Sequence, residues 1–176
     1  MLTPGAATTG DTSSDIGAVL TMPESGISDT ADLAGHTVAV NTLENIGDAT
    51  ISELVAQAGA DPDDVTFVEM GFPDMPAAVV EGQGAEVITY NFAETHPELL
   101  IAGYFTTDDY MEQEPETTDA FYAAMTESMA FAENNPEETR AILGTYTEID
   151  DDIQERMVMP RFPSEFPLEA MQDMAD

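Results

Sequence analysis

The chain of 176 residues has no cysteine and no lysine, and its 36 acidic residues face three arginines, which gives a formal net charge of −33. This charge argues against nucleic-acid binding and against insertion into an anionic membrane, and the missing cysteines exclude disulfides, zinc–thiolate sites, thiol nucleophiles and lipid attachment through cysteine. Because 43% of the residues are hydrophobic, the sequence predicts one domain or two small lobes with a real core.

The acidic residues are spread over the whole length instead of forming one block. An acidic interaction tail and a disordered chain are alternative explanations, but neither suits a sequence with many periodic apolar segments. We therefore expect a folded protein from a very salty environment, where salt screens self-repulsion. No apolar run reaches the length of about 18 residues that predicts a transmembrane helix. The first residues, MLTPGAATTGDTSSDIG, lack the basic and apolar regions of a signal peptide.

The N-terminal part is predicted to contain a loose segment and two strands. Residues 1–15 are small and polar and predict a flexible tail. The apolar run IGAVLTM predicts a strand that ends at Pro23, within a strand-and-linker segment over 16–34. Residues 37–41, TVAVN, predict a strand in a sheet that is covered on both faces.

The next segment has the pattern of an amphipathic helix that begins after Asn45. Asn45 and Asp48 have the spacing of a capping box, in which each side chain accepts a hydrogen bond from the other residue's backbone amide. Gly59 is a typical helix terminator. Spacings of i, i+3, i+4 and i+7 predict the buried face of this helix, which comprises Ile51, Leu54, Val55 and Ala58.

An α/β lobe is predicted over residues 35–100. After the first helix come a turn at 61–64, a strand at 65–69, a helix at 74–83 and a strand at 86–90. The first strand, the helix and the second strand form a βαβ unit. Because parallel strands end at the same edge of a sheet, the loops that follow these two strands are expected to face a shared crevice.

The rest of the chain, residues 101–176, is predicted to be mainly helical. Asn135-Pro136-Glu137-Glu138 is a strong helix start, with an Asn cap, Pro at the first position and acids in the first turn. A short strand is predicted at 103–107, and helices are predicted at 115–133, from 135 onward, at 150–157 and at 168–174. The longest of these helices is expected to bury a stripe made of Phe121, Met125, Met129 and Ala132.

Five phrases of the sequence carry a family resemblance. They lie at 32–43 (DLAGHTVAVNTL), 61–69 (DPDDVTFVE), 72–79 (FPDMPAAV), 102–110 (AGYFTTDDY) and 133–138 (ENNPEE). In order and spacing they resemble the sulfonate/nitrate/taurine-type solute-binding proteins of ABC transporters. The resemblance covers roughly residues 16–165. It implies an α/β, type II periplasmic-binding-protein-like fold that is incomplete here: one βαβ lobe with hinge strands, plus the C-terminal helices of the other lobe.

The resemblance also implies a function and a location. The resemblance implies a non-enzymatic solute-binding protein. Its two lobes close over a small solute about hinge strands, which here correspond to residues 19–22 and 103–107, and an ABC permease in the membrane recognises the closed form. Relative to the family, a segment with one central strand is missing after Gln83, and the sequence begins in the middle of the family pattern, so we expect a truncated member. The family is extracytoplasmic, whereas this sequence shows no export signal or lipid-attachment cysteine. A monomer is expected.

The loop after the first strand of the βαβ unit is the first candidate binding site. Free backbone N–H groups at a helix start, together with the helix dipole, attract a negative group such as a sulfonate or carboxylate. Thr42 and Asn45 add neutral side-chain donors, although Asn45 could serve only as a helix cap, and Glu44 would repel an anion unless it turns to solvent. The candidate ligand-binding residues here are Asn41, Thr42, Leu43, Asn45, Ile46 and Gly47.

The loop after the second strand of the βαβ unit supplies the other candidate residues, Phe72, Asp74 and Met75. An aromatic ring at the mouth of a cleft can stack on a flat solute. The alternative is purely structural: Phe72 packs on the helix start while Asp74 caps it.

No pattern in the sequence predicts a catalytic residue, a metal site or a cofactor. His36 and His96 are far apart and lack the partners that a metal site needs, and the acidic pairs lack the pattern of a calcium loop. Two alternatives to a solute-binding protein remain open. One is an enzyme acting on thiamine-pyrimidine precursors, and the other is an inactive fragment or interaction module that binds no solute.

Overall fold

The computed structural model describes residues 1–72, 75, 85–147 and 149–175, and it contains two compact units. Residues Gly10–Pro97 form the first, which we call the α/β unit. Residues Met1–Thr9 and Glu98–Asp176 form the second, which we call the helical unit.

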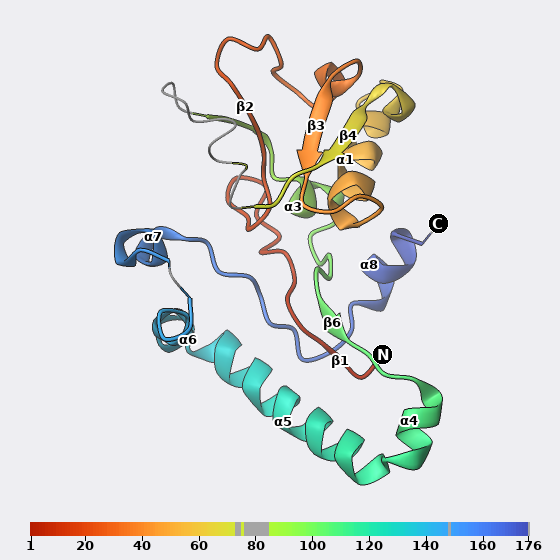
Figure 1. The fold of residues 1–176 in the computed structure, drawn as a ribbon, viewed down its shortest axis with the longest axis vertical. Helices are drawn as coiled ribbons and strands as arrows, with labels where there is room; N and C mark the ends of the chain where they lie inside the picture. The colour runs from red at the N-terminus through yellow and green to blue at the C-terminus, as the bar shows by residue number, and fades with distance from the viewer. Residues whose placement is uncertain (73–74, 76–84, 148, 176) are drawn as a thin grey trace. The chain divides into compact units, whose positions relative to one another are not determined.

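The α/β unit contains a parallel βαβ motif, as the sequence predicts (Figure 1). Strand β3 (Thr37–Val40) pairs with β4 (Thr66–Glu69) in parallel, with Thr37 opposite Thr66 and Val40 opposite Glu69. Helix α1 (Ile46–Gln57) and the 3-10 turn η2 (Pro62–Asp64) connect the two strands. A second pair is antiparallel and joins β2 (Val19–Thr21) to β5 (Glu86–Thr89). The unit also contains the turn η1 (Ala31–Leu33) and helix α3 (Asn91–Thr95).

One hydrophobic core joins both strand pairs to α1. Its buried members are Val19, Leu33, Val40, Ile51, Val55 and Val65. Val38, Phe67 and Ile88 pack against this cluster and are less buried. Although β2 and β3 both contribute to the core, the described strands form separate two-stranded sheets, β2–β5 and β3–β4. The apolar strands of this unit thus share one core without forming one continuous sheet.

Helix α1 confirms the local sequence signals. Both halves of the capping box between Asn45 and Asp48 are present, and Gly59 ends the helix region with a φ of 85°, which a residue with a side chain rarely adopts. Ile51, Leu54 and Val55 are buried as predicted. Ala58 is not: it is exposed, because the helix has already ended at Gln57 and Ala58 is the C-cap.

The predicted strands of this unit exist but are shorter than expected. The strand predicted at 16–22 is reduced to Val19–Thr21, and the one predicted at 86–90 ends at Thr89. A register shift between Val19 and Leu20 interrupts their pairing. The helix predicted at 74–83 lies outside the described residues except for Met75, which is helical.

In its described residues, the helical unit contains six elements besides strand β1. They are β6 (Gly103–Tyr104), α4 (Asp108–Gln113), α5 (Pro115–Asn134), α6 (Pro136–Leu143), α7 (Asp151–Arg156) and α8 (Leu168–Asp173). Thr107 caps α4 by accepting a hydrogen bond from the Tyr110 amide at 3.2 Å. Asn135 precedes α6 as predicted, but its side-chain amide donates to the Phe131 carbonyl instead of capping α6. None of the helices in the described part of the chain combines the length and hydrophobicity of a transmembrane segment.

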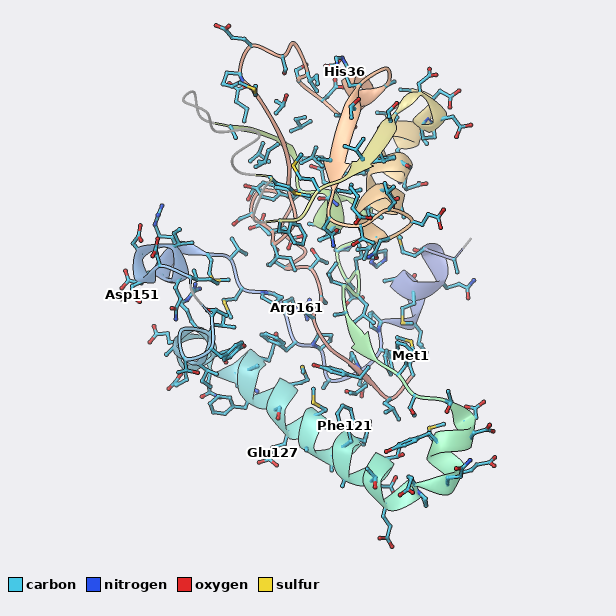
Figure 2. All side chains as sticks on the ribbon, in the orientation of Figure 1. Met1, His36, Phe121, Glu127, Asp151 and Arg161 are labelled. Atoms are coloured by element: carbon cyan, nitrogen blue, oxygen red, sulfur yellow. The ribbon has the colours of Figure 1, made fainter. Side chains whose placement is uncertain are left out.

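The stripe expected on α5 is buried only in part. Met129 is buried and Met125 and Ala132 are partly exposed, whereas Phe121 keeps 38% of its surface exposed. Phe121 contacts Tyr104 of β6 edge to face, with ring centroids 5.6 Å apart. Figure 2 shows Phe121 and Glu127 on opposite sides of α5, as expected for an amphipathic helix. The predicted amphipathic helix is thus present, but its apolar face is only partly buried.

The first residues differ from the flexible tail expected over 1–15. Strand β1 (Thr3–Pro4) pairs with β6, with Thr3 opposite Tyr104. Ala7 bridges both Leu100 and Arg161, and Thr3, Ala7 and Thr8 are buried. The small polar residues predict a flexible tail because no local pattern indicates a strand. The backbone is ordered instead by pairing with β6, about a hundred residues later in the chain.

Candidate functional site

The two predicted corners of the βαβ unit lie at the same edge of the β3–β4 sheet. Val40, the last residue of β3, is opposite Glu69, the last residue of β4. Directly beyond these strands the Met70 amide donates to the Val40 carbonyl at 2.8 Å. The loop of residues 41–45 and the loop that begins at Gly71 therefore leave the sheet side by side. This is the arrangement by which α/β proteins form binding crevices at strand ends.

The β3–α1 corner has its own acidic cap. The Asp48 carboxylate accepts hydrogen bonds from the backbone amides of Glu44 at 2.6 Å and Asn45 at 2.8 Å. The Asn45 side-chain oxygen accepts from the Ile46 amide at 2.7 Å and also from the Asp48 amide. Glu44 adopts a left-handed conformation with a φ of 56°, which is uncommon for a residue with a side chain. The turn is thus organised so that its amides converge on Asp48.

This cap changes the anion-binding interpretation of the corner. The amides of Glu44, Asn45 and Ile46 already have acceptors within the chain. The negative charge of Asp48 also offsets the positive end of the helix dipole, which would otherwise attract an anion. Among the described residues, no hydrogen bond engages the amides of Thr42, Leu43 or Gly47. Asn41 places its side-chain oxygen 3.9 Å from the position of a Cβ on Gly47. The donors left for a solute therefore lie at the end of β3 and at Gly47.

The second corner exposes an aromatic ring. Phe72 keeps 67% of its surface accessible, which argues against the alternative that it packs on a helix start. Met75 is partly exposed, and its amide donates to the Gly71 carbonyl at 3.3 Å. Asp74, the third candidate here, lies outside the described residues. An exposed Phe beside a polar corner can stack on a flat or apolar part of a solute.

A third strand end that the sequence analysis did not select borders α1. The buried Asn91, at the start of α3, donates from its side-chain amide to the Thr50 hydroxyl at 2.8 Å, and that hydroxyl donates to the Ile46 carbonyl at 2.7 Å. Thr89, the last residue of β5, is only 3% exposed, and its hydroxyl has no hydrogen-bond partner among the described residues. The sequence signal that could have predicted this third strand end is the polar residue Asn91, which directly follows the strand predicted at 86–90.

The α/β unit contains no arginine, since all three arginines lie in the helical unit. There they have local partners: Arg140 donates to the Met157 carbonyl at 2.7 Å, Arg156 pairs with Asp152 at 3.2 Å and Arg161 lies 3.8 Å from Glu133. No group of three or more His, Cys, Asp or Glu in the described part of the chain could hold a metal ion. The corners thus present neutral donors, acidic groups and the Phe72 ring.

Comparison with known families identifies the chain. The model of the NMT1/THI5-like family matches residues 12–139. The chain belongs to this family. The match includes both corners of the βαβ unit and the first two helices after β6. No curated protein sequence matches the chain.

Solved structures that share the fold include two sulfonate-binding proteins. The alkanesulfonate-binding protein SsuA from Xanthomonas axonopodis pv. citri, bound to MOPS, matches with a TM-score of 0.69 and 12% identity over 99% of this chain. The periplasmic aliphatic sulphonate-binding protein SsuA from Escherichia coli matches with a TM-score of 0.64 and 15% identity over 98% of this chain. The family member described here therefore has an α/β fold like that of a type II periplasmic binding protein. It spans 65% and 62% of the two SsuA chains.

Proposed function

We propose that the chain is the solute-binding component of an ABC importer, for a small solute of the sulfonate, nitrate, taurine or thiamine-pyrimidine-precursor class. The observation that carries the proposal is that the loops after β3 and β4 begin at one edge of the β3–β4 sheet, where the Met70 amide donates to the Val40 carbonyl. The family assignment and the likeness to two sulfonate-binding proteins support it. Two lobes would close over the solute about the strands β2 and β6.

The residues of the two corners would contribute to binding in different ways. Thr42, Leu43 and Gly47 offer backbone amides, Asn41 and Thr42 offer polar side chains, and Phe72 offers an apolar face. Asn45 and Ile46 would contribute by holding the turn in shape, because their amides and the Asn45 side chain already form the hydrogen bonds of the cap. Asp74 and Met75 would complete the second corner. Since the acidic cap opposes an anion, a zwitterionic solute, whose cationic part an acidic unit attracts, fits better than a bare anion.

The partner and location follow from the same proposal. A binding component delivers its solute to a permease, so the expected partner is an ABC permease in the membrane, and the expected location is outside the cytoplasm, as for the periplasmic protein from Escherichia coli. The net charge of −33 supports a salty environment. The binding function is not enzymatic and needs no cofactor.

Calorimetric titration in molar potassium chloride tests the proposal. Taurine, alkanesulfonates, nitrate and pyrimidine precursors are added to the folded full chain, and saturable binding of one class is expected. Gly47→Ala is the site variant: its new Cβ would lie 3.5 Å from the Val40 side chain, an ordinary contact, so the fold tolerates it while the methyl group obstructs the corner.

The control for Gly47→Ala is Gln57→Ala, at the exposed far end of the same helix. We expect Gly47→Ala to weaken binding several-fold and Gln57→Ala to leave it unchanged. Absence of binding by every solute to a chain with native circular dichroism would contradict the proposal and favour the non-binding fragment.

A further inference from the structure

The chain passes between the two units twice, once at Thr9–Gly10 and once at Pro97–Glu98. Neither crossing lies in β2 or β6, the strands that the family resemblance assigns to the hinge. Strand β2 pairs with β5 and places Val19 in the core of the α/β unit, and β6 pairs with β1 in the helical unit. Each of these strands therefore belongs wholly to one unit, and the connections between the units come before them in the chain.

On the side of the helical unit, the two connecting segments are hydrogen-bonded to each other up to the crossings. The Ile101 amide donates to the Ala6 carbonyl at 2.8 Å, and the Thr8 amide donates to the Leu99 carbonyl at 3.0 Å. Thr8 is fully buried and Leu99 is 2% exposed. These bonds and this burial hold both segments in the helical unit as far as Thr8 and Leu99.

On the side of the α/β unit, the same two segments pack against each other. A Cβ on Gly10 would lie 2.7 Å from the Pro97 carbonyl oxygen, which is closer than a real Cβ approaches, so the two backbones lie in direct contact there. A Cβ on Gly17 would lie 2.4 Å from the Phe92 ring of α3. The segment that precedes β2 is therefore packed against α3 and the residues that follow it, as a part of the α/β unit.

The residues at the two crossings differ in backbone freedom. Gly10 has a φ of 76°, in the left-handed region, and glycine has the widest range of backbone conformations. The ring of Pro97 restricts its φ, and His96 before it is extended, with a φ of −159° and a ψ of 133°, as residues before proline prefer. The second segment is thus stiff up to Pro97, and backbone freedom returns only after it.

We propose that these two crossings are the hinge of the protein. The units rotate relative to each other about Thr9–Gly10 and Pro97–Glu98, while β2 and β6 each move with their own unit. Hinges are a few loop residues that absorb changes in φ and ψ, and two crossings that leave each unit side by side favour rotation about a line through both. The inference rests on the proposed function for the purpose of the motion, which is closure over a solute, and it moves the hinge from β2 and β6 to these crossings.

Residual dipolar couplings of the isotope-labelled full chain test the proposal without a solute. The chain is aligned in a stretched polyacrylamide gel in molar salt and measured by NMR. Because hinge rotation takes place in microseconds to milliseconds, it averages the couplings, and the two units should fit alignment tensors of different magnitude. The tensor of the α/β unit should reproduce the couplings of residues 11–18, and that of the helical unit should reproduce those of residues 99–102.

Two results would overturn the proposal. One is a single tensor for both units, which would mean that they do not rotate. The other is a pair of tensors in which residues 11–18 follow the helical unit or residues 99–102 follow the α/β unit, because the hinge would then lie in β2 or β6.

Gly10→Ala has a matched control in Gly26→Ala. Both glycines have positive φ values, 76° and 79°, but a Cβ on Gly26 meets nothing within 4 Å, whereas a Cβ on Gly10 meets Pro97. Both variants impose similar backbone strain, and only Gly10→Ala disturbs a crossing. We expect Gly10→Ala to change the ratio of the two tensor magnitudes and Gly26→Ala to keep it. A ratio unchanged in both variants would contradict the hinge, and if Gly10→Ala does not fold, the wild-type couplings decide.

A solute separates this inference from the proposed function. Two tensors in a chain that binds no tested solute would support the hinge and contradict the function, whereas a single tensor in a chain that binds a solute would do the reverse. Where a solute binds, the two tensor magnitudes should converge, because the closed form fixes the units to each other. Magnitudes that stay apart at saturation would overturn the crossings as the means of closure.

Discussion

Two helices of this protein, α1 and α5, show that the burial of an amphipathic helix depends on the elements that pack against it. Helix α1 buries Thr50, Ile51, Leu54 and Val55, and two of them, Ile51 and Val55, belong to the core that includes residues of β2, β3 and η1. Helix α5 is longer, at 20 residues, yet buries only Thr118 and Met129. The apolar spacing is clear in both sequences. The difference therefore lies in what covers each helix, because hydrophobic stabilisation scales with the area removed from water.

The helical unit also exposes aromatic residues near α5. Phe105 and Tyr122 are exposed, and Tyr104 and Phe121 form an edge-to-face pair that remains partly accessible. The α/β unit, by contrast, has a closed cluster around Val55, which is fully buried. We therefore expect the α/β unit to be the more stable unit per residue, and the following changes test this contrast.

Truncation in the α1 core should have the largest effect. Ile51→Ala removes a side chain that is 5% exposed and packed between strands and helix, so we expect a loss of about 3 kcal/mol in unfolding free energy. Urea unfolding in molar salt measures it. A loss as small as that of the α5 substitution described below would contradict the contrast between the two helices.

Removal of the acidic cap should have a smaller and more informative effect. Asp48→Ala removes the acceptor of the Glu44 and Asn45 amides, and we expect about 1 kcal/mol of destabilisation, since caps contribute about that much. The same change frees the two amides and removes a negative charge, so binding of nitrate or a simple alkanesulfonate should become tighter. Calorimetry of the variant measures this gain.

The control for the cap is Asp48→Asn, which keeps an acceptor and removes the charge. If Asp48→Asn binds the anion as tightly as Asp48→Ala does, charge is the obstacle; if only Asp48→Ala gains affinity, occupation of the amides is the obstacle. An unchanged anion affinity in both variants would contradict the role of Asp48 at the corner.

The α5 face should tolerate truncation. Phe121→Ala loses an edge-to-face contact with Tyr104 from a side chain that is already 38% exposed, so we expect a loss below about 1.5 kcal/mol. The urea experiment used for Ile51→Ala gives the comparison. A loss as large as that of Ile51→Ala would show that α5 is covered in solution by something beyond the contacts described here.

Local signals predicted much of the fold. Asn45, Asp48 and Gly59 defined α1 because a capping box and a C-terminal glycine act within a few residues. The parallel pairing of β3 with β4 followed from the βαβ pattern. The two corners at one sheet edge were predicted from the same rule.

What the sequence did not predict depends on contacts between distant residues. Strand β1 is ordered by residues about a hundred positions later, and no local pattern in its small polar residues indicates this. The partial exposure of Phe121 depends on which residues pack against α5, and helical periodicity does not predict these. At the site, spacing predicted Asn45 as a cap, but the convergence of the Glu44 and Asn45 amides on Asp48 required the left-handed backbone at Glu44.

The smallest predicted effect concerns an exposed carboxylate in the turn before η1. Hydrogen bonds from the Ser28 backbone amide and then from the Ser28 hydroxyl, both at 2.9 Å, lower the pKa of Asp32 below its ordinary value of 3.8. Because the folded-state pKa is depressed, this carboxylate stabilises the turn above pH 3.8, and its contribution is lost as pH falls through the folded value. A pH titration of the Asp32 carboxyl by NMR should show the lowered pKa.

Ser28→Ala provides the internal comparison, because it removes the hydroxyl donor and leaves the backbone amide. The pKa of Asp32 should therefore rise part of the way toward 3.8 and remain below it. The pKa of Asp11, lowered by the Ser13 hydroxyl and amide in another turn, should not move. An Asp32 pKa at or above 3.8 in the wild type would mean that this turn does not persist in solution, and that order in the α/β unit is limited to the elements around the α1 core.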